Sequence, residues 1–247
     1  MIRIMRSFLC LLCFAIFGGG ALCLGGIIFP VMLLLYRKPE PRRKILSQSI
    51  HGSWKFFVWL MCWMRLISVK CNEIKELRKI SGHIIVANHP SLIDVVILIS
   101  LIPKCVCVVK KSLFHNLFIR GVIRNIYLPN DISAEEFIAR GSAFLDAGYN
   151  IVVFPEGTRT VDNRKVHLHR GFAYLHIKTK KPILPIHIEN CPRILGKRQK
   201  WYDVGDKTSV YTLKLKNAIT YKTTENRSMR DEAISVTRIA SNAMFAP

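Results

Sequence analysis

The pattern of apolar and polar positions divides the chain into two parts. From Ser7 to Tyr36 no side chain is charged, and this run exceeds the roughly 20 apolar residues that a helix needs to cross a bilayer. From residue 81 onward, short apolar runs bounded by turn residues alternate with helical stretches. That rhythm is typical of α/β proteins. The sequence therefore predicts an apolar N-terminal helix, 7–36, attached to an α/β domain.

Strands and helices can be assigned within the second part. The predicted strands are the apolar runs 83–88, 105–110, 150–156, 183–189 and 209–216. The predicted helices are 91–102, 133–147 and 229–243. The last two are preceded by Ser133 and Ser228, each with an acidic residue three positions on, which is close to the capping-box pattern of a helix start.

Aromatic side chains gather where the two parts meet. Trp54, Phe56, Phe57, Trp59 and Trp63 fall within what would be about three helical turns. Because Trp prefers the headgroup level of a bilayer, a helix over 54–69 would lie either along the membrane or against the domain core, and both alternatives stay open. We assign 1–70 to an N-terminal membrane segment and 71–247 to the globular domain.

The charged residues that flank the apolar segment indicate whether it is a cleaved signal peptide and how it is oriented in the membrane. Arg3 and Arg6 precede it, but it is too long for a cleaved signal peptide and lacks a small-x-small site followed by a polar mature start. Basic residues crowd the stretch 37–44 after it. Since positive flanks stay in the cytoplasm, the domain is expected on the cytoplasmic face. Gly18–Gly20 and Pro30 weaken a straight helix, so a bent or partly inserted segment is an alternative.

Composition limits the classes of function. The 247 residues include 37 Lys and Arg against 16 Asp and Glu, a formal net charge of +21, and 50% are hydrophobic. So much apolar content excludes a disordered polycation, and the charge predicts polyanionic partners. Of the eight cysteines, Cys10, Cys13 and Cys23 lie in the apolar segment, and the others are scattered without metal or disulfide spacing. A nucleic-acid-binding protein is disfavoured because the sequence has no zinc-finger spacing, RNP motif or basic zipper.

Two loops that follow predicted strands carry candidate chemistry. The first reads NHPSLID over 88–94, with His89 before a helix and Asp94 in its first turn. The turn can fold the carboxylate back toward the imidazole, and a carboxylate bonded to one ring nitrogen leaves the other as a proton acceptor. The alternative is an ordinary turn histidine beside a capping box made by Ser91 and Asp94.

The second loop follows the apolar residues NIVVF (150–154) of the predicted strand and reads PEGTRT over 155–160. It carries a carboxylate, a glycine turn, a hydroxyl and a guanidinium, and the guanidinium fork matches phosphate oxygens. Taken alone, this loop also fits an exposed turn with a surface ion pair. His167 and His169 alternate nearby but have no cysteine or carboxylate at ligand spacing, so no metal site is predicted.

Together the two loops resemble the signature of the glycerolipid acyltransferases, typified by the 1-acylglycerol-3-phosphate acyltransferases. The family pattern is a His and an Asp separated by four residues, followed by E-G-T-R, here NHPSLID and FPEGTRT. The resemblance extends over 45–220 and includes KKSLF at 110–114 and the proline-containing strand ILPIHI at 183–188. It implies a mixed central sheet flanked by helices, with an N-terminal membrane-associated helical segment.

The resemblance also implies an activity. A fatty acyl group would pass from acyl-CoA or acyl carrier protein to the hydroxyl of a lysolipid such as 1-acyl-glycerol-3-phosphate, in phospholipid biosynthesis. His89 would be the general base and Asp94 its orienter, with no covalent acyl-enzyme. Backbone N–H groups near His89 or Gly157 are candidates for stabilising the oxyanion. The substrate-binding residues implied are Glu156, Gly157, Thr158, Arg159, Lys110, Lys111, Arg120, Arg124 and Pro185.

The implied partners are the lysolipid acceptor, the acyl donor and an anionic membrane surface. No metal or cofactor is expected beyond the donor, which is a co-substrate. The implied location is a bacterial inner membrane, with the catalytic domain on the cytoplasmic face.

One departure from the family pattern concerns the acceptor. Many members carry an arginine that helps to bind the acceptor's phosphate after an apolar strand, whereas the corresponding stretch here, 126–131, reads IYLPND. Either Arg120 and Arg124 compensate, or the acceptor is another lysolipid, such as a lyso-ornithine lipid.

Two other classes remain as alternatives. A catalytically inactive membrane scaffold is disfavoured because both motifs are intact, and a hydrolase is disfavoured because the sequence has no G-x-S-x-G nucleophile elbow.

Overall fold

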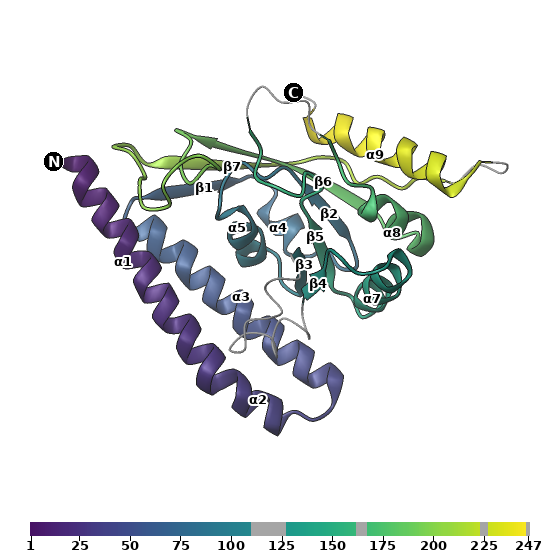
Figure 1. The fold of residues 1–247 in the computed structure, drawn as a ribbon, viewed down its shortest axis with the longest axis horizontal. Coiled ribbons are helices and arrows are strands. Elements are labelled where there is room, and N and C mark those ends of the chain that lie inside the picture. The colour runs from purple at the N-terminus through teal and green to yellow at the C-terminus, as the bar shows by residue number, and fades with distance from the viewer. Residues whose placement is uncertain (110–126, 162–166, 223–226, 246–247) are drawn as a thin grey trace.

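The computed structural model describes residues 1–109, 127–161, 167–222 and 227–245. Within these ranges the chain forms a seven-stranded sheet with helices on both faces and a helical hairpin at its N-terminus (Figure 1). All neighbouring strands are parallel except β6 and β7. The strands, in spatial order, are β1 (Ile67–Cys71), β7 (Ser209–Leu215), β6 (Ile183–Cys191), β2 (Ile84–Ala87), β5 (Asn150–Val153), β3 (Cys105–Val109) and β4 (Tyr127–Pro129).

Hydrophobic cores cover both faces of the sheet, so its central strands are apolar throughout. In β2, Ile85 and Ala87 belong to one core, and Ile84 and Val86 to the other, because successive side chains of a strand point to opposite faces. The first core lies under α3 (Pro39–Trp63) and α5 (Asp94–Leu101). The second lies under α7 (Ala134–Asp146), α8 (Gly171–Thr179) and α9 (Met229–Phe245) (Figure 1).

The N-terminal apolar segment is one long helical run. It comprises α1 (Ile2–Cys23), a π-helical turn η1 (Leu24–Ile28) and α2 (Phe29–Leu35). This run has 34 residues, a hydropathy of 2.3 over its most apolar window, and 17% of that window buried. It is therefore long and apolar enough to cross a membrane. The π-helical turn immediately precedes Pro30, a place where a helix commonly kinks.

Both ends of the hairpin formed by this run and α3 are attached to the domain. At one end, Arg3 pairs with Asp203, and the buried Arg6 donates hydrogen bonds to the backbone carbonyls of Arg65, Leu66, Gly205 and Lys207. Toward the other end, the Arg43 guanidinium lies 4.9 Å from the centre of the Phe144 ring on α7. The hairpin therefore runs along one side of the domain (Figure 1).

The helix predicted over 54–69 is wrong at both ends. It is the second half of α3, which begins at Pro39 and ends at Trp63. Arg65 has a φ of 55°, and the N–H groups of Arg65 and Leu66 donate to the carbonyls of Cys62 and Met61, which is the Schellman ending of a helix. The β-branched residues that follow form β1 against β7. The predicted domain boundary at residue 70 thus falls inside this strand.

The other strands and helices predicted for the domain are present with ends shifted by up to three residues, and the apolar N-terminal run begins at Ile2, five residues before its predicted start. Ser133 and Ser228 accept hydrogen bonds from the N–H groups of Glu136 and Asp231, as predicted from the capping-box pattern. The mixed sheet flanked by helices is confirmed. The prediction omitted β1, β4, α8 and the short helix α4 (Ile74–Leu77).

Candidate active site

Three loops meet at one edge of the sheet. Strands β6, β2 and β5 are neighbours and mutually parallel, so their carboxyl ends lie at the same edge, where α/β proteins bind ligands. The loop 88–94 follows β2 and the loop 154–160 follows β5, as predicted. The loop 192–200 follows β6 and was not predicted as part of the site.

Asp94 orients the imidazole of His89. The carboxylate of Asp94 is fully buried at the start of α5, and its Oδ2 lies 2.8 Å from His89 Nδ1. Ser91 donates its backbone N–H at 2.6 Å and its hydroxyl at 2.5 Å to the same carboxylate, so the histidine contact and a capping contact coexist. With its proton on Nδ1, the ring has Nε2 as the proton acceptor.

Two buried side chains, those of Asn88 and Tyr211, help to fix this turn. The amide of Asn88 donates to Ile188 O at 2.8 Å and accepts from Ile188 N–H at 2.7 Å, which fixes the turn to β6. Tyr211 on β7 is hydrogen-bonded to Ser91. Burial raises the pKa of Tyr211, so its hydroxyl stays protonated at neutral pH. Ser91, which donates to Asp94, is therefore itself hydrogen-bonded to β7.

Hydrogen bonds also join the two motif loops to each other. The His89 N–H lies 3.2 Å from Glu156 Oε1 and 3.1 Å from Thr160 Oγ1, while the Thr160 N–H donates to His89 O at 2.7 Å. The Thr160 hydroxyl donates to Glu156 at 2.6 Å. Glu156 and Thr160 thus fix the backbone of His89, and the ring of His89 stacks on Phe154 at 4.4 Å.

Gly157 is required by backbone conformation and by space. Its φ is +65°, and a Cβ there would lie 2.9 Å from His169 Nε2. The His169 N–H donates to Pro155 O at 2.7 Å, so the histidine is fixed to the same loop. His169 therefore packs on the turn of the second motif, a role that sequence spacing did not indicate.

Arg159 connects the second motif to the third loop. Its Nη1 donates to Leu195 O and Gly196 O, both at 3.0 Å. The N–H of Leu92, in the first motif, donates to the same Leu195 carbonyl at 3.0 Å. The third loop is therefore hydrogen-bonded to both motifs.

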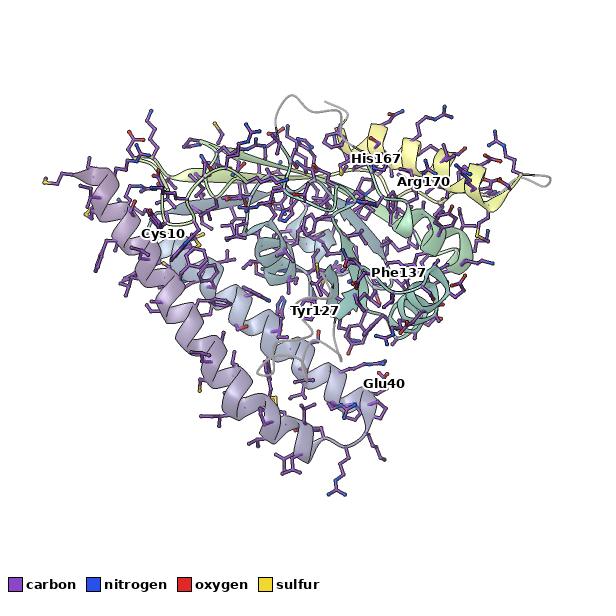
Figure 2. All side chains as sticks on the ribbon, in the orientation of Figure 1. Cys10, Glu40, Tyr127, Phe137, His167 and Arg170 are labelled. Carbon is purple, nitrogen blue, oxygen red and sulfur yellow. The ribbon has the colours of Figure 1, made fainter. Side chains whose placement is uncertain are left out.

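A cavity of about 850 Å³ opens between the three loops and α7. His89, Thr158 and the cations Arg159, Arg170 and Lys197 line its polar part. Its apolar part is formed by side chains from β3, α7, α8 and the neighbouring loops, and Figure 2 labels Phe137 of α7 among them. The apolar lining residues include Val108, Val109, Ile132, Phe137, Ile138, Val153, Phe154 and Phe172. A cavity lined by both basic and apolar side chains fits an amphipathic, anionic ligand.

The structure revises the roles of some predicted site residues. Neither Glu156 nor Pro185 is among the described residues that line the cavity. Pro185 is buried in the middle of β6, between β2 and β7, so it is a sheet residue and does not contact the cavity. The N–H of Gly157 donates to Phe154 O at 3.0 Å, so neither it nor the engaged N–H of His89 is available for an oxyanion.

Some predicted residues lie outside the described ranges, namely Lys110, Lys111, Arg120 and Arg124. Conversely, Thr160, Arg170 and Lys197 belong to the site and were not predicted. Thr160 directly follows the E-G-T-R motif. Arg170 lies between the second loop and α8, and Lys197 lies within the third loop, each with other basic residues nearby in the sequence. Their only sequence signal is charge or a hydroxyl close to a strand end.

The chain is similar to known acyltransferases. A model of the acyltransferase family matches residues 68–189. A 1-acyl-sn-glycerol-3-phosphate acyltransferase from Cocos nucifera is 27% identical over 164 residues, which cover 63% of this chain and 51% of that protein. A human 1-acyl-sn-glycerol-3-phosphate acyltransferase beta is 25% identical over 180 residues, which cover 67% and 61%. The chain thus spans about half to three fifths of the length of the curated relatives it matches.

A solved structure has the same fold. The crystal structure of PlsC from Thermotoga maritima, a 1-acyl-sn-glycerophosphate acyltransferase, matches with a TM-score of 0.69 at 20% identity, over the whole of both chains. The architecture therefore extends to the N-terminal helices.

Proposed function

The chain belongs to the glycerolipid acyltransferase family, and we propose that it transfers a fatty acyl group from a thioester to the hydroxyl of a lysolipid. The observation that carries this proposal is the His89–Asp94 pair, 2.8 Å apart, at a cavity lined by both basic and apolar side chains. The pair supplies a base, and the cavity matches the two chemically distinct ends of a lysolipid.

In the proposed reaction His89 acts as the general base. A lipid hydroxyl is a weak nucleophile, so removal of its proton by Nε2 as the oxygen attacks the thioester carbonyl accelerates the step by about 10²- to 10⁴-fold. The new ester C–O bond forms as the C–S bond breaks, and the proton on Nε2 passes to the departing thiolate. Asp94 stabilises the imidazolium between these two transfers.

We assign 1-acyl-glycerol-3-phosphate as the acceptor. The names of the curated relatives support this choice, and Arg159 at the cavity supplies a guanidinium that binds phosphate oxygens well. The apolar wall around Phe137 and Ile138 suits an acyl chain. A lyso-ornithine lipid is the second candidate, because Tyr127–Asp131 has no arginine. The donor is acyl-CoA or acyl carrier protein.

We further propose that the chain is bound to a membrane through its N-terminal hairpin. The side chains of Phe56, Trp59 and Trp63 lie along one face of α3 and are 49%, 56% and 67% exposed. The apolar face of α1, which includes Phe8 and Ile16, is exposed as well. Since both ends of the hairpin contact the domain, we favour a hairpin lying in one leaflet. The cytoplasmic face of a bacterial inner membrane is the proposed location.

A panel of acceptors tests the proposed activity. Purified full-length protein in phospholipid vesicles would be incubated with labelled acyl-CoA or acyl carrier protein and with 1-acyl-glycerol-3-phosphate, lyso-ornithine lipid or lysophosphatidylcholine. A labelled diacyl product with 1-acyl-glycerol-3-phosphate supports the proposal. Free fatty acid as the only product supports a hydrolase, and no product with any pair of substrates contradicts transfer.

A further inference from the structure

The loop after β6 contains a strained residue next to the catalytic motifs. Leu195 has a φ of 57° and is fully buried, although only glycine, asparagine and aspartate adopt this left-handed conformation readily. Such strain persists only where surrounding contacts determine the backbone. Strained residues of this kind cluster at binding and catalytic sites.

The carbonyl of Leu195 is the point at which the three loops join. It accepts hydrogen bonds from Leu92 N–H in the first motif and from Arg159 Nη1 in the second, both at 3.0 Å. Within the loop, Gln199 accepts from Gly196 N–H at 2.8 Å and donates to Arg193 O at 2.9 Å. The backbone around Leu195 is therefore fixed relative to His89 and Arg159.

Lys197 follows this fixed turn by two residues and lines the cavity. Its side chain is exposed, and within the described part of the chain it has no ion-pair partner. Arg159, the other cation on these loops that lines the cavity, already donates one nitrogen to backbone carbonyls. Lys200, three residues further on, instead lies over the Tyr202 ring at 5.8 Å and does not line the cavity.

We propose that the segment 192–200 is a third substrate-binding loop, in which Lys197 binds the phosphate monoester of the lysolipid acceptor. The bonds to Leu195 O set the position of Lys197 relative to His89, so that a phosphate held between Lys197 and Arg159 brings the acceptor hydroxyl within reach of the base. A phosphate monoester carries close to two negative charges at neutral pH, and two cations neutralise it better than one. This inference rests on the proposed function and adds a specificity-determining residue to it.

Equilibrium binding tests the inference without turnover. Calorimetry would titrate 1-hexanoyl-glycerol-3-phosphate into the purified full-length protein in detergent. The Lys197→Gln variant is expected to bind about tenfold more weakly, since a charge-assisted contact is lost. The Lys200→Gln variant removes the same charge from the same loop and is expected to bind like the wild type, and Lys197→Arg is expected to restore most of the affinity. Equal thermal stability of the variants excludes misfolding.

Steady-state kinetics separate this inference from the proposed function. With 1-acyl-glycerol-3-phosphate, Lys197→Gln is expected to raise the acceptor KM about tenfold while kcat and the donor KM stay unchanged. With neutral 1-monoacylglycerol as acceptor, the variant and the wild type should not differ. Wild-type transfer with an unchanged acceptor KM in Lys197→Gln would overturn the inference and leave the activity intact. Equal weakening by Lys197→Gln and Lys200→Gln, or a rise in the donor KM alone, would also overturn it.

Discussion

At the scale of single residues, the proposed chemistry depends on a carboxylate that receives several hydrogen bonds at once. Asp94 is fully buried and accepts from His89 Nδ1 and from the N–H and hydroxyl of Ser91. A buried carboxylate is stable only when its oxygens are paired in this way. The same contacts fix its direction, and through it the tautomer of His89.

Asp94→Asn tests this orientation. The amide NH₂ group would face Nδ1 and favour the opposite tautomer, with Nε2 protonated, so we expect kcat to fall by about 10²- to 10⁴-fold. Ser91→Ala removes a hydroxyl and keeps the Ser91 N–H and the contact between Asp94 and His89, so its loss should stay within about tenfold. Initial rates of labelled diacyl product measure both. Wild-type turnover in Asp94→Asn would contradict the assigned role.

Gly157→Ala tests the turn of the second motif. The new methyl group would be strained at a φ of +65° and would displace His169, so we expect kcat/KM to fall about tenfold. Gly205→Ala is a matched control, because Gly205 has a φ of +66° and open space around its Cβ position. Both variants should lose similar thermal stability, and only Gly157→Ala should lose activity. Equal activities would show that His169 does not need to be fixed there.

Residues of the two motifs were predictable from sequence because each motif directly follows a strongly apolar strand. Thr160, Arg170 and Lys197 were not, since nothing in a local pattern distinguishes them from other hydroxyls and cations. Pro185 was assigned to the site by resemblance alone, and it lies inside β6 and is not among the residues that line the cavity. The local sequence does not show which side chains face the cavity.

At the scale of elements, the site forms because three parallel strands, β6, β2 and β5, are neighbours in the sheet. β6 pairs with β2 although about 100 residues separate them, and no sequence pattern indicates that pairing. The loop after β6 could therefore not be assigned to the site in advance. Helix α8 was missed because most of its residues, among them Phe172, Leu175 and Ile177, are buried, which leaves no polar face to mark a helical period.

The attachment of α1 to the domain can be tested at Arg6. This guanidinium is buried and donates to backbone carbonyls from two segments, so Arg6→Met leaves buried acceptors unpaired. We expect the free energy of unfolding to fall by roughly 2–4 kcal/mol, measured by denaturant titration in detergent. Arg3→Met, which loses only an exposed ion pair with Asp203, should change stability little. Equal stabilities of Arg6→Met and the wild type would contradict the anchoring role.

At the scale of the whole molecule, we propose that the hairpin binds the membrane and that the cavity binds the lysolipid. The apolar N-terminal run was predictable from composition because no charge interrupts it. Its arrangement was not, since the flanking basic stretch 37–44 indicated only an orientation, whereas in the structure that stretch runs into α3, which returns along the domain. Because α3 returns along the domain, the long N-terminal run that packs on α3 also lies beside the domain.

Membrane binding through the hairpin can be tested at the aromatic face of α3. The combined variant Phe56→Ser, Trp59→Ser and Trp63→Ser removes exposed apolar area from one face, and we expect its partition coefficient to anionic vesicles to fall at least about tenfold. A control variant, Ile234→Ser with Ile239→Ser, changes exposed apolar residues of α9 on the other side of the sheet. Flotation measures both. Equal partitioning of the two variants would contradict a role for this face.

The most direct test of the central claim is the rate of acyl transfer in a His89→Ala variant. Wild-type protein, His89→Ala and a control, His83→Ala, would be assayed in the same vesicles with labelled donor and 1-acyl-glycerol-3-phosphate. His83 lies just before the start of β2, at the opposite end of this strand from His89. We expect His89→Ala to lose at least about 10²-fold in kcat at unchanged protein level and stability, and His83→Ala to retain wild-type activity. Wild-type turnover in His89→Ala would contradict the account.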